Sequence, residues 1–118
     1  MKNNMQMYVN GQLVLDNIRV ADTVWQRFVG LIGTKEFAAN DALLIMPCNS
    51  VHMFGMRYPI DVVFLTRSGT ILKVVCKLKP MGIAMCAQAY QALELPAGTA
   101  VRLGLAVRKE VTLRALMD

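Results

Sequence analysis

Apolar and polar side chains alternate along much of this chain with the two-residue period of a β-strand. From Met5 to Val9 the odd-numbered residues are apolar, and the residues between them carry polar groups. Asn10-Gly11 follows at once, and this dipeptide favours the positive φ angles of a two-residue hairpin turn. The pattern therefore predicts a β-hairpin over residues 5–15.

A helical period follows the hairpin. Asp22-Thr23 is a favourable pair for capping a first helical turn, because both side chains accept hydrogen bonds from free backbone amides. The apolar residues behind it have the i, i+1, i+4, i+5 spacing of one helical face, namely Val24, Trp25, Phe28 and Val29. Gly30 or Gly33 is suited to end the helix. We expect one short helix near residues 22–30, packed on one side or end of a sheet.

From residue 42 onward the pattern predicts short strands separated by turns. The predicted strands are residues 42–46, 51–56, 60–66, 71–79, 89–95 and 111–116. Pro59 separates the second from the third, residues 67–70 form a hairpin turn, and residues 80–88 are expected to be a loop. About eight short strands with one helix indicate a mainly β (α+β) domain, with a compact barrel- or sandwich-like sheet.

The strand predicted over residues 71–79 has the clearest alternation. The face expected to pack against the core carries Leu72, Val74, Cys76 and Leu78. The face expected to be exposed to solvent carries Lys73, Val75, Lys77 and Lys79. These lysines contribute to a net charge of +5, which raises nucleic acid as a partner. No aromatic residues interleave with them to stack on bases, so a solvated strand face is the favoured interpretation.

The composition limits the class of protein. The chain has 118 residues, of which 55% are hydrophobic and 18% charged; this indicates one folded domain over residues 1–118 and excludes disorder. No segment is long and apolar enough to span a bilayer, and the N-terminal residues lack the hydrophobic core of a signal peptide. The three cysteines follow no disulfide or zinc-site spacing. We expect a basic, cytoplasmic protein with reduced thiols and no metal or cofactor.

The candidate chemistry gathers between Cys48 and Leu65, a stretch that holds the only histidine. If residues 51–56 are extended, Ser50 and His52 lie on one face about 7 Å apart, at a rise of about 3.3 Å per residue. Cys48 would lie about 13 Å from His52, too far for a nucleophile–base pair. Ser50 has no strand–turn–helix elbow to expose it, so a serine triad with His52 is disfavoured.

Three charged side chains complete the candidate site. Asp61 begins a predicted buried strand, where a carboxylate usually accepts hydrogen bonds from backbone amides, and pairing with Arg57 is the alternative. Glu94 lies between two leucines, and it either faces water or needs a partner such as Arg57 or His52. The candidate binding residues are therefore Ser50, His52, Arg57, Asp61 and Glu94.

Several motifs, in order along the chain, resemble those of one protein family. They are Gly30-Leu-Ile-Gly33, Ala42-Leu-Leu, Cys48-Asn-Ser-Val-His-Met-Phe-Gly-Met56, Pro59-Ile-Asp-Val-Val-Phe-Leu65, Ala92-Leu-Glu-Leu-Pro-Ala-Gly98 and Leu103-Gly-Leu105. From about residue 21 to residue 113 the chain is similar to the DUF192 (UPF0127) family of small prokaryotic proteins.

The resemblance implies a mainly β domain with a short helix near its start, and it brings no established activity. It marks the family's recurring polar positions at Ser50, His52, Met56, Asp61, Glu94 and Gly98. Arg108-Lys109 stands where relatives commonly have Gly-Asp, and the lost glycine removes easy access to a positive φ. We therefore expect the turn before Val111 to be of another type.

These observations favour a small binding domain, with a polar site around His52 and Asp61 and a small molecule or a protein as its ligand. The alternative is a small hydrolase or metal-dependent enzyme that uses His52 with Asp61 or Glu94. That function requires the histidine and a carboxylate to converge within hydrogen-bond distance at an open cleft. Nucleic-acid binding through Lys73, Lys77 and Lys79 is the weakest of the three hypotheses.

Overall fold

The computed structural model describes residues 4–21, Phe37 and residues 41–116. The helix expected near residues 22–30 lies outside these described residues. The described elements are β1 (Asn4–Val9), β2 (Gln12–Ala21), β3 (Leu43–Ile45), β4 (Ser50–His52), β5 (Ile60–Leu65), β6 (Ile71–Leu78), β7 (Ile83–Met85), β8 (Gln91–Pro96), α2 (Thr99–Arg102) and β9 (Thr112–Ala115). Among the described helices, none has the length and apolar character needed to cross a membrane.

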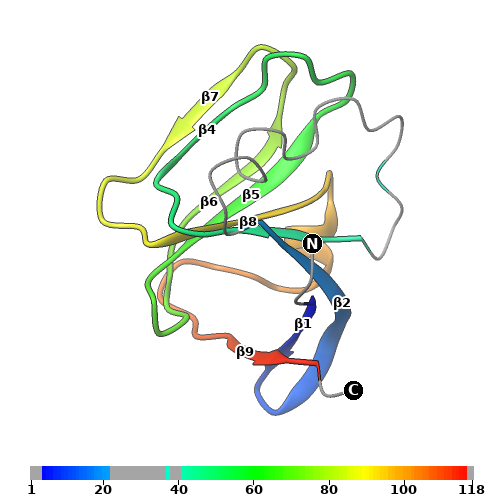
Figure 1. Cartoon of the computed structure of the whole chain (residues 1–118), viewed down its shortest axis with the longest axis vertical. Coiled ribbons are helices and arrows are strands. Elements are labelled where there is room, and N and C mark those ends of the chain that lie inside the picture. The colour runs from blue at the N-terminus through cyan, green and yellow to red at the C-terminus, as the bar shows by residue number, and fades with distance from the viewer. Residues whose placement is uncertain (1–3, 22–36, 38–40, 117–118) are drawn as a thin grey trace.

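The described strands form two sheets (Figure 1). Seven of them make one sheet with the order β6-β5-β8-β3-β2-β1-β9, and β4 pairs with β7 alone in the second. In Figure 1 the β4–β7 pair lies at the top, and β9 and the β1–β2 hairpin lie at the bottom. The mainly β fold of about eight short strands is confirmed, and the sheet is sandwich-like and not closed into a barrel.

The first hairpin forms as predicted. β1 and β2 pair in antiparallel fashion, with Val9 opposite Gln12 across the turn. Both turn residues have a positive φ, 51° at Asn10 and 77° at Gly11. These angles match the twist of the flanking strands, which is why this dipeptide is a reliable local signal.

Most later strands also form where the alternation predicts them. β3, β5, β6, β8 and β9 all overlap predicted strands. β4 is shorter than predicted because the chain turns at Phe54 and Gly55, with the Met56 amide donating to the Met53 carbonyl at 3.1 Å. The loop prediction for residues 80–88 was wrong at its centre, where β7 pairs with β4.

The large sheet is buried on both faces at β5, where every residue is buried. Alternate residues of β5 pack into two separate hydrophobic clusters. Val63 belongs to the first cluster, together with Ala100 of α2. Val62 belongs to the second cluster, together with Val51 of β4 and Ala84 of β7. At β5, one face of the large sheet therefore packs against α2, with side chains of β1 and β2 in the same cluster, and the other face packs against the β4–β7 pair.

A β-bulge interrupts β6. While β5 advances two residues from Ile60 to Val62, β6 passes through three, from Leu78 to Val75. Lys77, inside the bulge, has a positive φ of 54°. An extra residue on one strand reverses the face to which the following side chains point.

The prediction that alternate residues of β6 share one packed face was wrong because of this bulge. Cys76 is exposed, Val74 packs against the first cluster, and Leu78 packs against the second. Lys73 lies opposite Phe64, a residue of the second cluster, and so shares a face with Leu78. The predicted face of three lysines is therefore divided.

The turn before β9 keeps a positive φ although its glycine is missing. Arg108 has a φ of 78°. Its amide donates to the Ile71 carbonyl at 2.8 Å, and the Val111 amide donates to the Gly69 carbonyl at 2.9 Å. Such hydrogen bonds offset the cost of a left-handed conformation in a residue with a side chain. The expectation that this turn would take another form was wrong.

Candidate functional site

Asp61, the second residue of β5, is fully buried and lies on the face covered by α2. One carboxylate oxygen accepts a hydrogen bond from the Lys77 amide in the β6 bulge at 2.9 Å. The other accepts one from the Ala100 amide in the first turn of α2, also at 2.9 Å. Gly98, which precedes α2, has no side chain to cap that turn, so Asp61 supplies the cap from a distant strand.

This arrangement agrees with the interpretation of Asp61 as a carboxylate bonded to backbone amides. Each of its oxygens holds a backbone amide, and Arg57 is exposed in the segment before β5. Asp61 therefore links three elements of the fold, and nothing in this geometry presents its carboxylate to a substrate.

Glu94 lies on the opposite face of the same sheet. In the β5–β8 register Asp61 faces Leu95 and Val62 faces Glu94, so the two acidic side chains point in opposite directions. Only 6% of Glu94 is exposed, and burial raises the pKa of its carboxyl group from 4.5 to about 7. The structure therefore does not bring Asp61 and Glu94 together.

Tyr58 lies close enough to Glu94 for the two side chains to interact electrostatically. Burial raises the pKa of the Tyr58 hydroxyl, the charges of Glu94 and Asp41 raise it further, and Arg19 lowers it. The Tyr58 hydroxyl oxygen is buried, and it has no hydrogen-bond partner among the residues that the structure describes. Its ring packs near Phe37, with centroids 6.4 Å apart. Sequence reasoning missed this tyrosine, since nothing in its spacing places it over the middle of a sheet.

His52 lies on the outer side of the β4–β7 pair. Val51 and Ala84 face each other and are buried against the large sheet, so their neighbours point outward. Those neighbours form two facing pairs, Ser50 with Met85 and His52 with Ile83. The structure thus keeps Ser50 and His52 on one face, as predicted, but places His52 in the outer layer, away from the buried Asp61 and Glu94.

Large apolar side chains surround His52 on this surface. The His52 and Phe54 rings have centroids 5.7 Å apart. Phe54 is 51% exposed, Ile83 60% and Met85 62%, and Met81 at the end of the pair is 64% exposed. We call this surface the outer face; its members are Ser50, His52, Phe54, Met81, Ile83 and Met85. Its β7 residues were missed because their alternation with Gly82 and Ala84 was interpreted as a loop of small residues.

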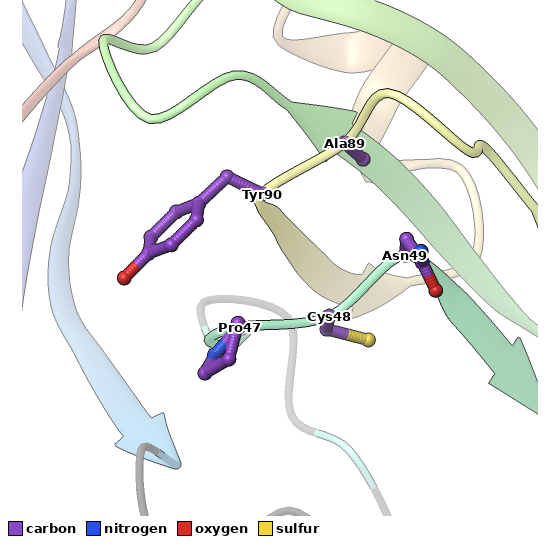
Figure 2. A pocket seen from close by; sticks show the side chains of 5 residues that line it. All are labelled: Pro47, Cys48, Asn49, Ala89 and Tyr90. Carbon is purple, nitrogen blue, oxygen red and sulfur yellow. The ribbon is translucent and has the colours of Figure 1, made fainter.

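A shallow pocket of about 210 Å³ lies near the start of β4. Figure 2 shows its lining residues, Pro47, Cys48, Asn49, Ala89 and Tyr90. The Tyr90 ring and the Cys48 sulfur point in different directions (Figure 2), and the Cys48 thiol donates to the Ser50 carbonyl at 3.1 Å. The pocket therefore lacks the convergent polar groups of a catalytic site.

The described part of the chain contains no group of three or more His, Cys, Asp or Glu side chains that could hold a metal ion. The structure also brings His52 together with neither Asp61 nor Glu94. The class that the fold and the site define is a two-layer β domain with an exposed apolar surface around a histidine.

The chain belongs to the DUF192 family, described as "Uncharacterized ACR", whose model matches residues 5–113. The family resemblance of the sequence motifs is thereby confirmed. No match was found among curated proteins.

Two solved structures have a similar fold. One is a protein of unknown function from Novosphingobium aromaticivorans, with a TM-score of 0.79, 17% identity, and coverage of 92% of this chain and 83% of that one. The other, from Sinorhizobium meliloti, is described as "a putative transcription regulator" and has a TM-score of 0.80, 23% identity, and coverage of 93% and 92%. At these identities the similarity concerns the fold alone.

Replacing Asp61 tests its structural role. In Asp61→Ala the amides of Lys77 and Ala100 lose their acceptor inside the fold, so we expect the free energy of unfolding to fall by about 2–4 kcal/mol. Urea unfolding measures it. His52→Ala is the control, because an exposed side chain should change this free energy by less than about 0.5 kcal/mol. A similar loss in both variants, or no loss in Asp61→Ala, would contradict this role.

Glu94 makes stability depend on pH. Burial raises the folded-state pKa to about 7, above the unfolded value of 4.5, so the folded protein binds the extra proton between these limits. The free energy of unfolding should therefore fall as pH rises from about 5 to 7 and stay low above that range. Glu94→Gln should lose this decline and exceed the wild type at pH 8 by up to about 3 kcal/mol.

Urea unfolding from pH 5 to pH 8 measures this slope. Glu110→Gln is the matched control, because Glu110 is an exposed residue of the turn before β9, and this variant should keep the wild-type slope. Parallel curves for Glu94→Gln and the wild type would show that burial of Glu94 does not govern the pH dependence.

Proposed function

We propose that this protein is a non-catalytic binding domain and that the outer face, centred on His52, is its recognition surface for a protein partner. The main support for this proposal is that three large apolar side chains flank the histidine on this surface. Each is more than half exposed, with Phe54 at 51%, Ile83 at 60% and Met85 at 62%. Grouped apolar side chains of this kind mark interaction sites on soluble domains.

The predicted site residues take different parts in this proposal. Ser50 and His52 lie on the recognition surface, and the exposed Arg57 follows the turn at the end of β4. Asp61 contributes indirectly, because it links β5, β6 and α2 in the fold that supports this surface. Glu94 stands apart, buried on the side of the large sheet that carries the β4–β7 pair.

The other hypotheses have less support. An enzyme that uses His52 with Asp61 or Glu94 needs the histidine and the carboxylate within hydrogen-bond distance. Asp61 instead faces α2 on the far side of the large sheet, and Glu94 is buried in the fold while His52 points outward. Binding of nucleic acid through three lysines of one face is weakened by the bulge that divides them. A cytoplasmic location stays a prediction from the sequence.

Site-specific photo-crosslinking in cells of the source organism tests the proposal. A photoreactive phenylalanine analogue at Ile83 should form a discrete adduct with one protein, and the adduct should weaken when His52→Ala is added. The control position is Val101 of α2, which is 75% exposed on the other side of the large sheet. No adduct from position 83, or the same adducts from both positions, would overturn the proposal.

A further inference from the structure

We infer that the partner of the outer face is an acidic protein segment, one that presents apolar side chains together with carboxylates. This inference rests on the proposed function and names the chemistry of its ligand. Two observations carry it: the sign of the charges around the outer face, and the polar groups at its centre.

Positive charge dominates the part of the chain that builds the outer face. From residue 48 to residue 90 the basic residues are Arg57, Arg67, Lys73, Lys77 and Lys79, and the only acidic residue is Asp61. Asp61 is fully buried and bonded to two amides, so it offers no negative charge to a ligand. The exposed charges of this segment are therefore all positive.

Two of these lysines lie at the border of the outer face. The Lys73 ammonium donates to the Met85 carbonyl at 2.9 Å, which places its charge beside the last residue of β7. The Lys79 carbonyl accepts the Gly82 amide at 2.8 Å, which places the backbone of the exposed Lys79 beside the residue that precedes β7. The bulge contributes to this arrangement, because it places Lys73 and Leu78 on the face of the large sheet that carries the β4–β7 pair.

An apolar surface with a basic border is complementary to a segment in which aliphatic or aromatic residues alternate with Asp or Glu. A second copy of this chain fits less well, because it would bring the same lysines near one another. An anionic lipid surface has the right charge, but Ser50 and His52 lie at the centre of the face, and lipid tails offer them no hydrogen-bond partners. A peptide backbone does.

Selection from a displayed random peptide library, with the whole protein as bait, tests the inference. We expect selected peptides to be enriched in acidic residues next to large apolar ones. Isothermal titration with the best synthetic peptide should then show weaker binding to Lys73→Glu by about tenfold, because an attraction becomes a repulsion at the border. Binding should also weaken at least about tenfold in Ile83→Ser, which removes apolar contact.

The chain offers a matched control for each variant. The Lys109 ammonium, like that of Lys73, is exposed and donates to a backbone carbonyl at 2.9 Å, that of Gly104, so Lys109→Glu should bind like the wild type. Val101→Ser removes an exposed apolar side chain from α2 and should also leave binding unchanged. Melting temperatures of the four variants confirm that each is folded.

The possible failures are distinguishable. Selected peptides that are neutral or basic, or equal losses in Lys73→Glu and Lys109→Glu, would overturn the acidic partner while the outer face remained a binding surface. The acidic partner would also be overturned if no peptide is selected and the protein sediments with phosphatidylserine vesicles, or if the protein forms a dimer that Ile83→Ser dissociates. If no peptide is selected and position 83 gives no crosslink, the inference and the proposed function fail together.

Discussion

A carboxylate with no exposed surface is tolerated in a protein core only if other groups replace its lost water. In this domain two backbone amides replace it for Asp61: one comes from the β6 bulge and one from the first turn of α2. Each of these amides also lacks a regular partner, because a bulge interrupts a ladder and a first helical turn has no preceding carbonyl. The buried carboxylate and the two unpaired amides thus satisfy one another, and a single side chain links α2, β5 and β6.

The register of these strands determines where the other polar groups lie. Because the bulge reverses the alternation of β6, Lys73 comes to the side of the β4–β7 pair, where it meets the carbonyl of Met85. Strand alternation places Glu94 on that same side of the sheet, away from Asp61. The candidate residues of the predicted site are therefore separated in the fold. Asp61 links elements in the core, Glu94 is buried on the opposite face of the sheet, and His52 lies on the outer face.

The sequence predicted features that depend on neighbours along the chain. Asn10-Gly11 encodes its own turn, and the apolar run of β5 must be buried whatever covers it. The bulge in β6 could not be predicted, because the group that accepts its Lys77 amide is the carboxylate of Asp61 on another strand, 16 residues away in the sequence. The outer position of His52 likewise depends on the pairing of β4 with β7, a strand whose alternation with small residues resembles a loop.

Folding of the β4–β7 pair depends on its inner side. Val51 and Ala84 are buried against the large sheet and hold the pair in place. The stability of the pair therefore does not require apolar side chains at its outer, solvent-exposed positions. A polar residue with a high strand propensity, such as threonine, would suit these positions and would lower the risk of aggregation. Phe54, Ile83 and Met85 instead keep more than half of their surface exposed. Since the fold does not require apolar side chains at these positions, their presence is best explained by a contact outside the domain, which is the reason to look for function on this face.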